Sequence, residues 1–231
     1  MHVHVNAAVS VDGKLSSRRR EQVRISGADD FDRVDRIRAA ADAVLVGVGT
    51  VLADDPRLTL DEEDRRVQRL RNGRPGSPAR VVADSRARTP TDARILDDAA
   101  TTYLLVGDGA DPDRLAALRD AGAEIVAAGG GAGDDDAGNG GRVDLAAALD
   151  ALEREGIDRL MVEGGGEVIF SLFEANLVDE LTVYVGSLVI GGRDAPTLAD
   201  GEGFVDPDSF PRLTLVGVDR VDDGVLLSYE S

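Results

Sequence analysis

Strand-like and helix-like segments alternate along most of this chain, and the alternation restricts its possible folds more than any other feature. A first strand is expected over residues 2–11 and a helix over 30–41, where Phe31, Val34, Ile37 and Ala41 fall at helical spacing. Further strands are expected over 43–49, 79–84, 103–107, 124–127 and 159–162, and further helices over 111–122, 145–155 and 167–177. Such alternation predicts a mostly parallel central sheet with helices on both faces.

After residue 177 the pattern changes to three strand runs with little helix between them, over 180–190, 212–221 and 224–230. The last two runs are separated by Asp222-Asp223-Gly224, a hairpin turn signal. The sheet is therefore expected to finish with antiparallel strands. Ser26 and Asp29 have the spacing of a capping box before the first helix.

Two segments read as mobile loops: 61–77, which is charged and holds glycine and proline, and the low-complexity stretch 129–142. Neither reads as a linker, because strand and helix patterns resume across both. We therefore expect one α/β domain over residues 1–231.

Composition excludes several classes of function. Cysteine is absent, so disulfides, cysteine-based zinc sites and a thiol nucleophile are excluded. His2 and His4 share one face of a strand but have no third ligand nearby in the sequence, so no metal site is expected. The net charge of −18 would repel nucleic-acid phosphates. Scattered acids of this kind are typical of a halophilic protein that stays soluble in high salt.

The chain has no apolar run of about 18 residues and no signal-peptide pattern at its start. A cytoplasmic protein is expected on that basis.

The sharpest candidate site is "LMVEGGGEVIFSLF", in which a strand ends at Glu163 and runs through Gly164, Gly165 and Gly166 into an amphipathic helix. Glycine amides and a helix N-terminus suit a diphosphate. The alternative is a flexible strand-to-helix turn. The spacing matches neither the dinucleotide fingerprint nor a P-loop.

A second candidate is "VLVGVGTVLADDPRLT", an apolar strand that ends in glycine, hydroxyl and acid. Thr50 could donate to a phosphate or a ribose, and Asp54 could accept from ribose hydroxyls. The alternative is an N-cap threonine followed by a turn at Asp-Asp-Pro.

Four more polar residues could touch a ligand. Asn6 lies in a strand expected to be buried, so its amide needs partners. Ser85 and Arg86 follow another strand and could hold a 2′-phosphate such as that of NADP, unless they lie in a plain exposed loop. Arg38 lies beside an apolar helix stripe and could reach a substrate phosphate, although arginines there are more often surface residues.

Taken in order, several stretches resemble one known family: "NAAVSVDGKLS", "RISGADDFDRVDRIRAAADAVLVGVGTVLADDPRLT", "VVADSRARTP", "VEGGGEVIFSLFEANLVDEL" and "VGSLVIGGRDAPTL". They are similar to the reductase domain of riboflavin biosynthesis, which has the dihydrofolate-reductase-like fold. The stand-alone archaeal type fits best. It implies NADPH-dependent reduction of a ribosylaminopyrimidine phosphate to the ribitylamino form, with NADH as a possible substitute, and a homodimer.

The resemblance also implies roles for individual residues. The cofactor contacts that it implies are Ala8, Arg24, Ser26, Thr50, Asp54, Ser85, Gly164, Gly165, Gly166 and Glu167; Arg86 joins them as an expected contact because it follows Ser85 after the strand. The expected substrate contacts are Asn6, Arg38, Leu58 and Glu163. Glu163 is the first candidate for proton donor or electrostatic partner, and Asp12 is the second. Bacterial relatives often have lysine where Asn6 stands and arginine where Asp61 stands, which makes the substrate side less well defined than the cofactor side.

Two other functions stay open at this point. One is a dihydrofolate reductase on the same fold, and the other is a non-catalytic module that senses NADP(H). The bifunctional bacterial relatives carry a zinc deaminase domain, and without cysteine to ligate that zinc no deaminase activity is expected.

Overall fold

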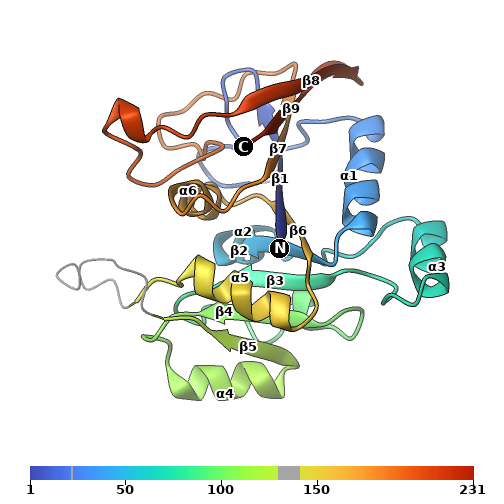
Figure 1. Ribbon diagram of the computed structural model, residues 1–231, viewed down its shortest axis with the longest axis vertical. Coiled ribbons are helices and arrows are strands. Elements are labelled where there is room, and N and C mark those ends of the chain that lie inside the picture. The colour runs from blue at the N-terminus through green and yellow to red at the C-terminus, as the bar shows by residue number, and fades with distance from the viewer. Residues whose placement is uncertain (22, 130–140) are drawn as a thin grey trace.

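A computed structural model describes residues 1–21, 23–129 and 141–231 (Figure 1). Within these ranges a nine-stranded sheet has the order β5-β4-β3-β2-β6-β1-β7-β9-β8. Its strands are β1 (His2–Ser10), β2 (Ala43–Gly47), β3 (Ala79–Ala83), β4 (Thr102–Val106), β5 (Ala123–Ala127), β6 (Arg159–Glu163), β7 (Glu180–Gly186), β8 (Thr214–Val221) and β9 (Gly224–Glu230).

Six α-helices connect these strands in the described part of the chain. They are α1 (Ala28–Ala40), α2 (Val48–Asp54), α3 (Glu63–Arg71), α4 (Pro112–Asp120), α5 (Leu145–Arg154) and α6 (Gly166–Glu174). The described residues also hold the short 3-10 turns η1 (Arg94–Leu96) and η3 (Pro207–Ser209).

In the spatial order of the sheet, the strands β5, β4, β3, β2, β6, β1 and β7 pair in parallel with their neighbours. The strand β9 pairs antiparallel with β7 on one side and with β8 on the other. The expected mostly parallel sheet with antiparallel C-terminal strands is therefore confirmed. The carboxyl ends of β3, β2, β6, β1 and β7 meet at one edge, where open α/β sheets bind their ligands.

The core has two layers, one on each face of the sheet. On one face Leu45 and Val162 pack with Leu149 of α5 and Ile169 of α6. On the other face Met161 joins a cluster that draws on Ile37 of α1, Val51 of α2 and Leu118 of α4. Alternate strand residues supply the two clusters, as the two-residue period of a strand requires. Helices thus cover both faces, as expected.

The segment 61–77 differs from the loop that was expected, because α3 occupies residues 63–71. Its sequence is almost entirely polar, and packing of charged groups holds it in place. The Arg69 side chain is buried and donates from Nη1 to the carbonyls of Ala39 (2.8 Å) and Ala41 (2.7 Å) at the end of α1. Of the other expected loop, residues 130–140 lie outside the described residues.

The start of α1 also differs from expectation. Its N-cap is Gly27, and no side chain from the expected capping box is used. The carboxylate of Asp222, in the turn between β8 and β9, accepts from the backbone N–H groups of Asp29 (3.2 Å) and Asp30 (3.0 Å). A residue almost two hundred positions away therefore caps this helix. No helix of the described residues is long and apolar enough to cross a membrane.

Candidate active site

The strand-to-helix turn between β6 and α6 packs against the matching turn between β2 and α2. Gly164 and Gly165 have φ angles of +74° and +88°, a region that favours glycine. A Cβ placed on Gly165 would lie 3.3 Å from the backbone N of Gly47, and one placed on Gly164 would lie 3.9 Å from Thr50 Oγ1. The glycines and Thr50, separated by more than a hundred residues in sequence, therefore form one corner.

Thr50 and Asp54 lie one helical turn apart on α2, so both belong to the same face of that helix. Asp54 is exposed, yet the neighbouring atoms desolvate its carboxylate enough to raise its pKa. A carboxylate in this setting is available to accept hydrogen bonds from a ligand's hydroxyl groups. Glu167, in the first turn of α6, is also exposed.

Ser85 lies two residues beyond the end of β3, whose last residue pairs with Gly47 in the sheet. The Ser85 carbonyl accepts from the Gly107 N–H at 3.1 Å, and its Oγ accepts from the Val143 N–H at 3.3 Å. Arg86 follows with an exposed side chain. Both residues therefore lie on the same carboxyl edge as the glycine corner, one strand away from it.

Ala8, Arg24 and Ser26 lie on the other side of the glycine corner, toward β7. Ala8 and Ile25 pack in one small cluster, and a Cβ on Gly186 would lie 2.5 Å from the Ile25 carbonyl. The Arg24 guanidinium sits 5.5 Å from the centre of the Phe31 ring, and its Nε donates to the Ser26 carbonyl at 3.3 Å. The segment around residues 24–26 thus lies in space against the carboxyl end of β7.

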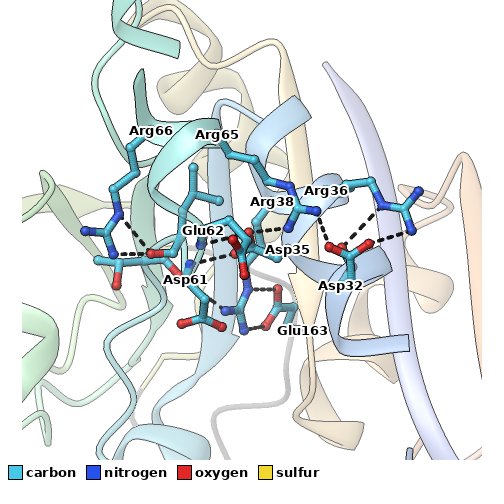
Figure 2. A network of polar contacts seen from close by, with 11 residues as sticks. Asp32, Asp35, Arg36, Arg38, Asp61, Glu62, Arg65, Arg66 and Glu163 are labelled. Carbon is cyan, nitrogen blue, oxygen red and sulfur yellow. Dashed lines mark hydrogen bonds and ion pairs between the residues drawn. The ribbon is translucent and has the colours of Figure 1, made fainter. Parts of the chain in front are cut away.

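Arg38 and Glu163 form a two-pronged ion pair at the end of β6 (Figure 2). Nε of Arg38 donates to Oε1 and Nη2 to Oε2, each at 2.6 Å. Burial lowers the pKa of Arg38, but attraction to Glu163 and the bonds to it outweigh burial, and the net effect is a raised pKa. Both oxygens of Glu163 are therefore engaged by the Arg38 guanidinium.

Asn6 is buried in β1 and pairs in register with Glu163 on β6. Its Oδ1 accepts from Arg33 Nη2 and from Thr182 Oγ1, each at 2.8 Å. The partners that a buried amide requires are thus supplied by the protein itself. What Asn6 can still offer a ligand is the N–H of its Nδ2.

Leu58 is buried and has a φ of +51°, an uncommon conformation for a residue with a branched side chain. The next residue, Thr59, accepts a hydrogen bond from Arg38 Nη1 at 3.4 Å. The loop after α2 therefore passes directly beside the Arg38–Glu163 pair.

Asp12 has a structural role. Its carboxylate accepts from Ser10 Oγ (2.6 Å) and from the N–H groups of Ile190 (3.0 Å) and Gly191 (2.7 Å). These bonds favour the charged form and lower the pKa of Asp12 to about 2. Asp12 thus ties the exit of β1 to the loop after β7, and its role as second acid candidate stays a prediction.

Sequence reasoning missed Asp35 and Arg65, which pair beneath this site and join α1 to α3 (Figure 2). Asp35 falls outside the apolar stripe of Val34, Ile37 and Ala41, so the helical pattern gave no signal that it is buried. In the described ranges no group of three or more histidine or acidic side chains is arranged to hold a metal ion.

The sequence matches the family model described as the RibD C-terminal domain over residues 1–227. It is 45% identical over 216 residues to the 2,5-diamino-6-ribosylamino-4(3H)-pyrimidinone 5′-phosphate reductase of Archaeoglobus fulgidus, covering 94% of both chains. It is 41% identical over 229 residues to the protein of the same name from Methanothermobacter thermautotrophicus, covering 99% of this chain and 97% of the relative.

Solved structures share the fold at lower identity. A pyrimidine reductase-like protein from Corynebacterium diphtheriae superposes with a TM-score of 0.81 at 19% identity, over 99% of this chain and 91% of the other. The riboflavin biosynthesis reductase Rib7 of Saccharomyces cerevisiae gives 0.68 at 20% identity, over 99% and 89%. A deaminase/reductase from Thermotoga maritima gives 0.73 at 22% identity, and the match covers 56% of that longer chain.

Proposed function

Because the chain belongs to the RibD C-terminal domain family, we propose that it reduces 2,5-diamino-6-(ribosylamino)-4(3H)-pyrimidinone 5′-phosphate to the ribitylamino form in riboflavin biosynthesis. The observation that carries this proposal is the near-full-length identity to two archaeal reductases named for that substrate. The site agrees with an oxidoreductase: a glycine corner suited to a dinucleotide adjoins a charged pair suited to a polar substrate.

The glycine corner has room and hydrogen-bond donors for the diphosphate of a nicotinamide dinucleotide. Side chains are absent at Gly164 and Gly165, and the amides there border Thr50 (3.9 Å from a Cβ placed on Gly164). Backbone N–H groups and a hydroxyl are the donors that a diphosphate accepts from. We assign Asp54 to the ribose hydroxyls, and Ser85 with Arg86 to the 2′-phosphate that distinguishes NADPH from NADH.

In the reaction the sugar of the substrate would open to an imine, and a nicotinamide cofactor, when bound, would supply the hydride that C1′ of this imine accepts. The chain's own task is to hold this flat acceptor in one orientation, which alone can account for much of a rate enhancement. Glu163, fixed by Arg38, acts as an electrostatic partner for the positive charge that grows as the imine nitrogen is protonated. The Nδ2 group of Asn6, beside Glu163 on the neighbouring strand, binds a sugar hydroxyl.

Arg38 can serve the substrate phosphate while it stays paired with Glu163. A guanidinium has five N–H bonds, and the contacts of Arg38 use Nε, one N–H of Nη1 and one of Nη2. One N–H on each Nη is left for a phosphate oxygen. Leu58, whose backbone conformation sets the path of the adjacent loop, borders the same space.

The activity is tested by mixing the protein with the ribosylaminopyrimidine phosphate and NADPH, or NADH, in molar salt. Loss of absorbance at the dihydronicotinamide band is expected, faster with NADPH. Oxidation of NADPH with dihydrofolate alone would instead support a dihydrofolate reductase. NADPH binding without turnover of either substrate would indicate a sensor module and refute the proposal.

We also propose a homodimer and a preference for high salt. The outer strand β8 exposes Leu215, Val216 and Val218, an edge that a second copy would cover. The net charge of −18 makes the folded chain repel itself, and added salt screens that repulsion.

A further inference from the structure

Helix α1 buries an acidic residue on the side that faces α3. Asp35 is only 3% exposed and lies within the polar network drawn in Figure 2. Its Oδ1 accepts from the Asp61 N–H at 2.8 Å, and its Oδ2 accepts from Arg65 Nη1 at 2.6 Å and more weakly from the Glu62 N–H at 3.4 Å. A buried carboxylate is costly without partners, and here all of its partners come from one segment of the chain.

Arg65 extends this contact into a clamp between the two helices. Its Nη2 donates to Asp32, one turn before Asp35 on α1, while Nη1 holds Asp35. Hydrogen bonds to Asp32 and Asp35 raise the pKa of Arg65. The Asp61 and Glu62 amides precede the first residue of α3, where helices leave backbone donors unsatisfied. Asp35 therefore fixes the start of α3 as well as its first turn.

The segment that Asp35 holds also borders the substrate side of the site. Arg38, one helical turn after Asp35, donates to the Thr59 carbonyl and pairs with Glu163. The stretch 58–62 is thus attached to α1 at two points, through Arg38 near its start and through Asp35 near its end. The Leu60 carbonyl between them accepts from Arg66 of α3 at 2.9 Å.

We propose that Asp35 is a positioning residue for substrate binding, and this inference rests on the proposed function. It does not touch the substrate. It anchors residues 58–62, and so keeps Leu58 and the Arg38–Glu163 pair in the arrangement that receives the sugar phosphate. None of these hydrogen bonds of Asp35 reaches the cofactor corner of Thr50 and the glycines, so the proposal predicts an effect on the substrate side alone.

Asp35→Asn tests the proposal, with Asp32→Asn as the matched control. The first variant turns an amide N–H₂ or a weaker acceptor toward the donors of Asp61 and Arg65, whereas the second removes the other carboxylate bound to Arg65 without touching the backbone of 58–62. Asp35→Asn should raise KM for the pyrimidine substrate about tenfold and leave Kd for NADPH unchanged. Asp32→Asn should change either constant by less than about twofold.

Hydrogen exchange at the Asp61 and Glu62 amides gives a readout that needs no activity. Both amides should exchange faster in Asp35→Asn than in Asp32→Asn. If the wild-type protein does not reduce the pyrimidine substrate, the proposed function fails. The hydrogen-exchange rates still show whether Asp35 anchors residues 58–62. An unchanged KM in Asp35→Asn, or a KM and an NADPH Kd that rise together, would overturn the positioning role.

Arg65→Leu keeps the test decisive if Asp35→Asn does not fold. It preserves packing against α1 but leaves Asp35 without its charged partner. The expected result is again a raised KM with an unchanged Kd for NADPH. Wild-type values of both constants in this variant would overturn the proposal.

Discussion

Two aspartates at the carboxyl edge of the sheet have their proton equilibria shifted in opposite directions. Asp12 accepts hydrogen bonds from a hydroxyl and from backbone amides, which favour its charged form. Asp54 is desolvated, which disfavours the charge. The first pattern is that of a structural carboxylate, and the second is common at binding sites.

For Asp54 we predict a pH-dependent affinity for NADPH. Ribose hydroxyls donate to the ionised carboxylate, and the raised pKa means that ionisation is lost at a higher pH than for an ordinary aspartate. As the pH falls, NADPH binding should therefore weaken at a higher pH than it would with an ordinary aspartate at this position. Asp54→Asn should bind about tenfold more weakly at neutral pH, with a flatter profile, in fluorescence titrations across pH. A variant with wild-type affinity and profile would remove Asp54 from the cofactor site.

For Asp12 we predict an effect on stability. Its folded pKa of about 2 lies below the ordinary aspartate value, so its stabilising contribution is present above that ordinary value and is lost as the pH falls toward 2. Asp12→Asn should lower Tm at neutral pH, and the difference from wild type should shrink on acidification. A Tm difference that stays constant over this range would contradict the account.

At this scale the sequence predicts some residues well and others poorly. Gly164 directly follows β6, and Thr50 and Asp54 lie on the short helix α2 that follows β2, so their place at the sheet edge could be read from local pattern. The partner of Arg38 could not, because Glu163 lies 125 residues away and no spacing rule connects them. The role of Asp35 could not be predicted either, because its partners belong to a distant segment whose sequence is typical of a loop.

Among the elements, the turn between β6 and α6 is the most constrained. At Gly165 a side chain would be strained by the positive φ and would also approach Gly47. Gly73, at the end of α3, has a similar φ of +74° but open space around it.

The pair Gly165→Ala and Gly73→Ala separates these two effects. Both variants should lose about 1–2 kcal/mol in the free energy of unfolding from the positive φ. Only Gly165→Ala should also lose NADPH binding, by tenfold or more, because the corner must open to admit the methyl group. Calorimetry and equilibrium titration measure the two quantities. Equal NADPH affinity in the two variants would contradict the assignment of the corner.

Helix α3 and the N-terminal cap of α1 are two features that local sequence patterns did not predict. Apolar periodicity predicted α5 and α6 because their buried faces are apolar. It also predicted α1, although the fully buried residues of that helix are Asp30 and Asp35. In α3 the buried residue is an arginine that binds backbone carbonyls, so periodicity had nothing to detect. The cap of α1 comes from Asp222 in a distant turn, and local capping rules cannot identify such a partner.

For the whole molecule, the exposed face of β8 supports a testable dimer. Val218 on β8 and Leu70 on α3 are each 60% exposed, so they form a matched pair. If β8 lies in a dimer interface, Val218→Asp should shift the protein to monomers in sedimentation experiments, because it buries an unpaired charge. Leu70→Asp should leave the assembly unchanged. A wild-type monomer, or a dimer that tolerates Val218→Asp, would place any interface elsewhere.

The dinucleotide corner is the premise on which the proposed chemistry depends, and a crystal structure with NADPH tests it most directly. The diphosphate should lie against the amides of Gly164–Gly166 and the hydroxyl of Thr50, with a ribose within reach of Asp54. Its reduced ring should face the Arg38–Glu163 pair. A cofactor bound at any other part of the surface, with this corner filled by solvent, would contradict the account.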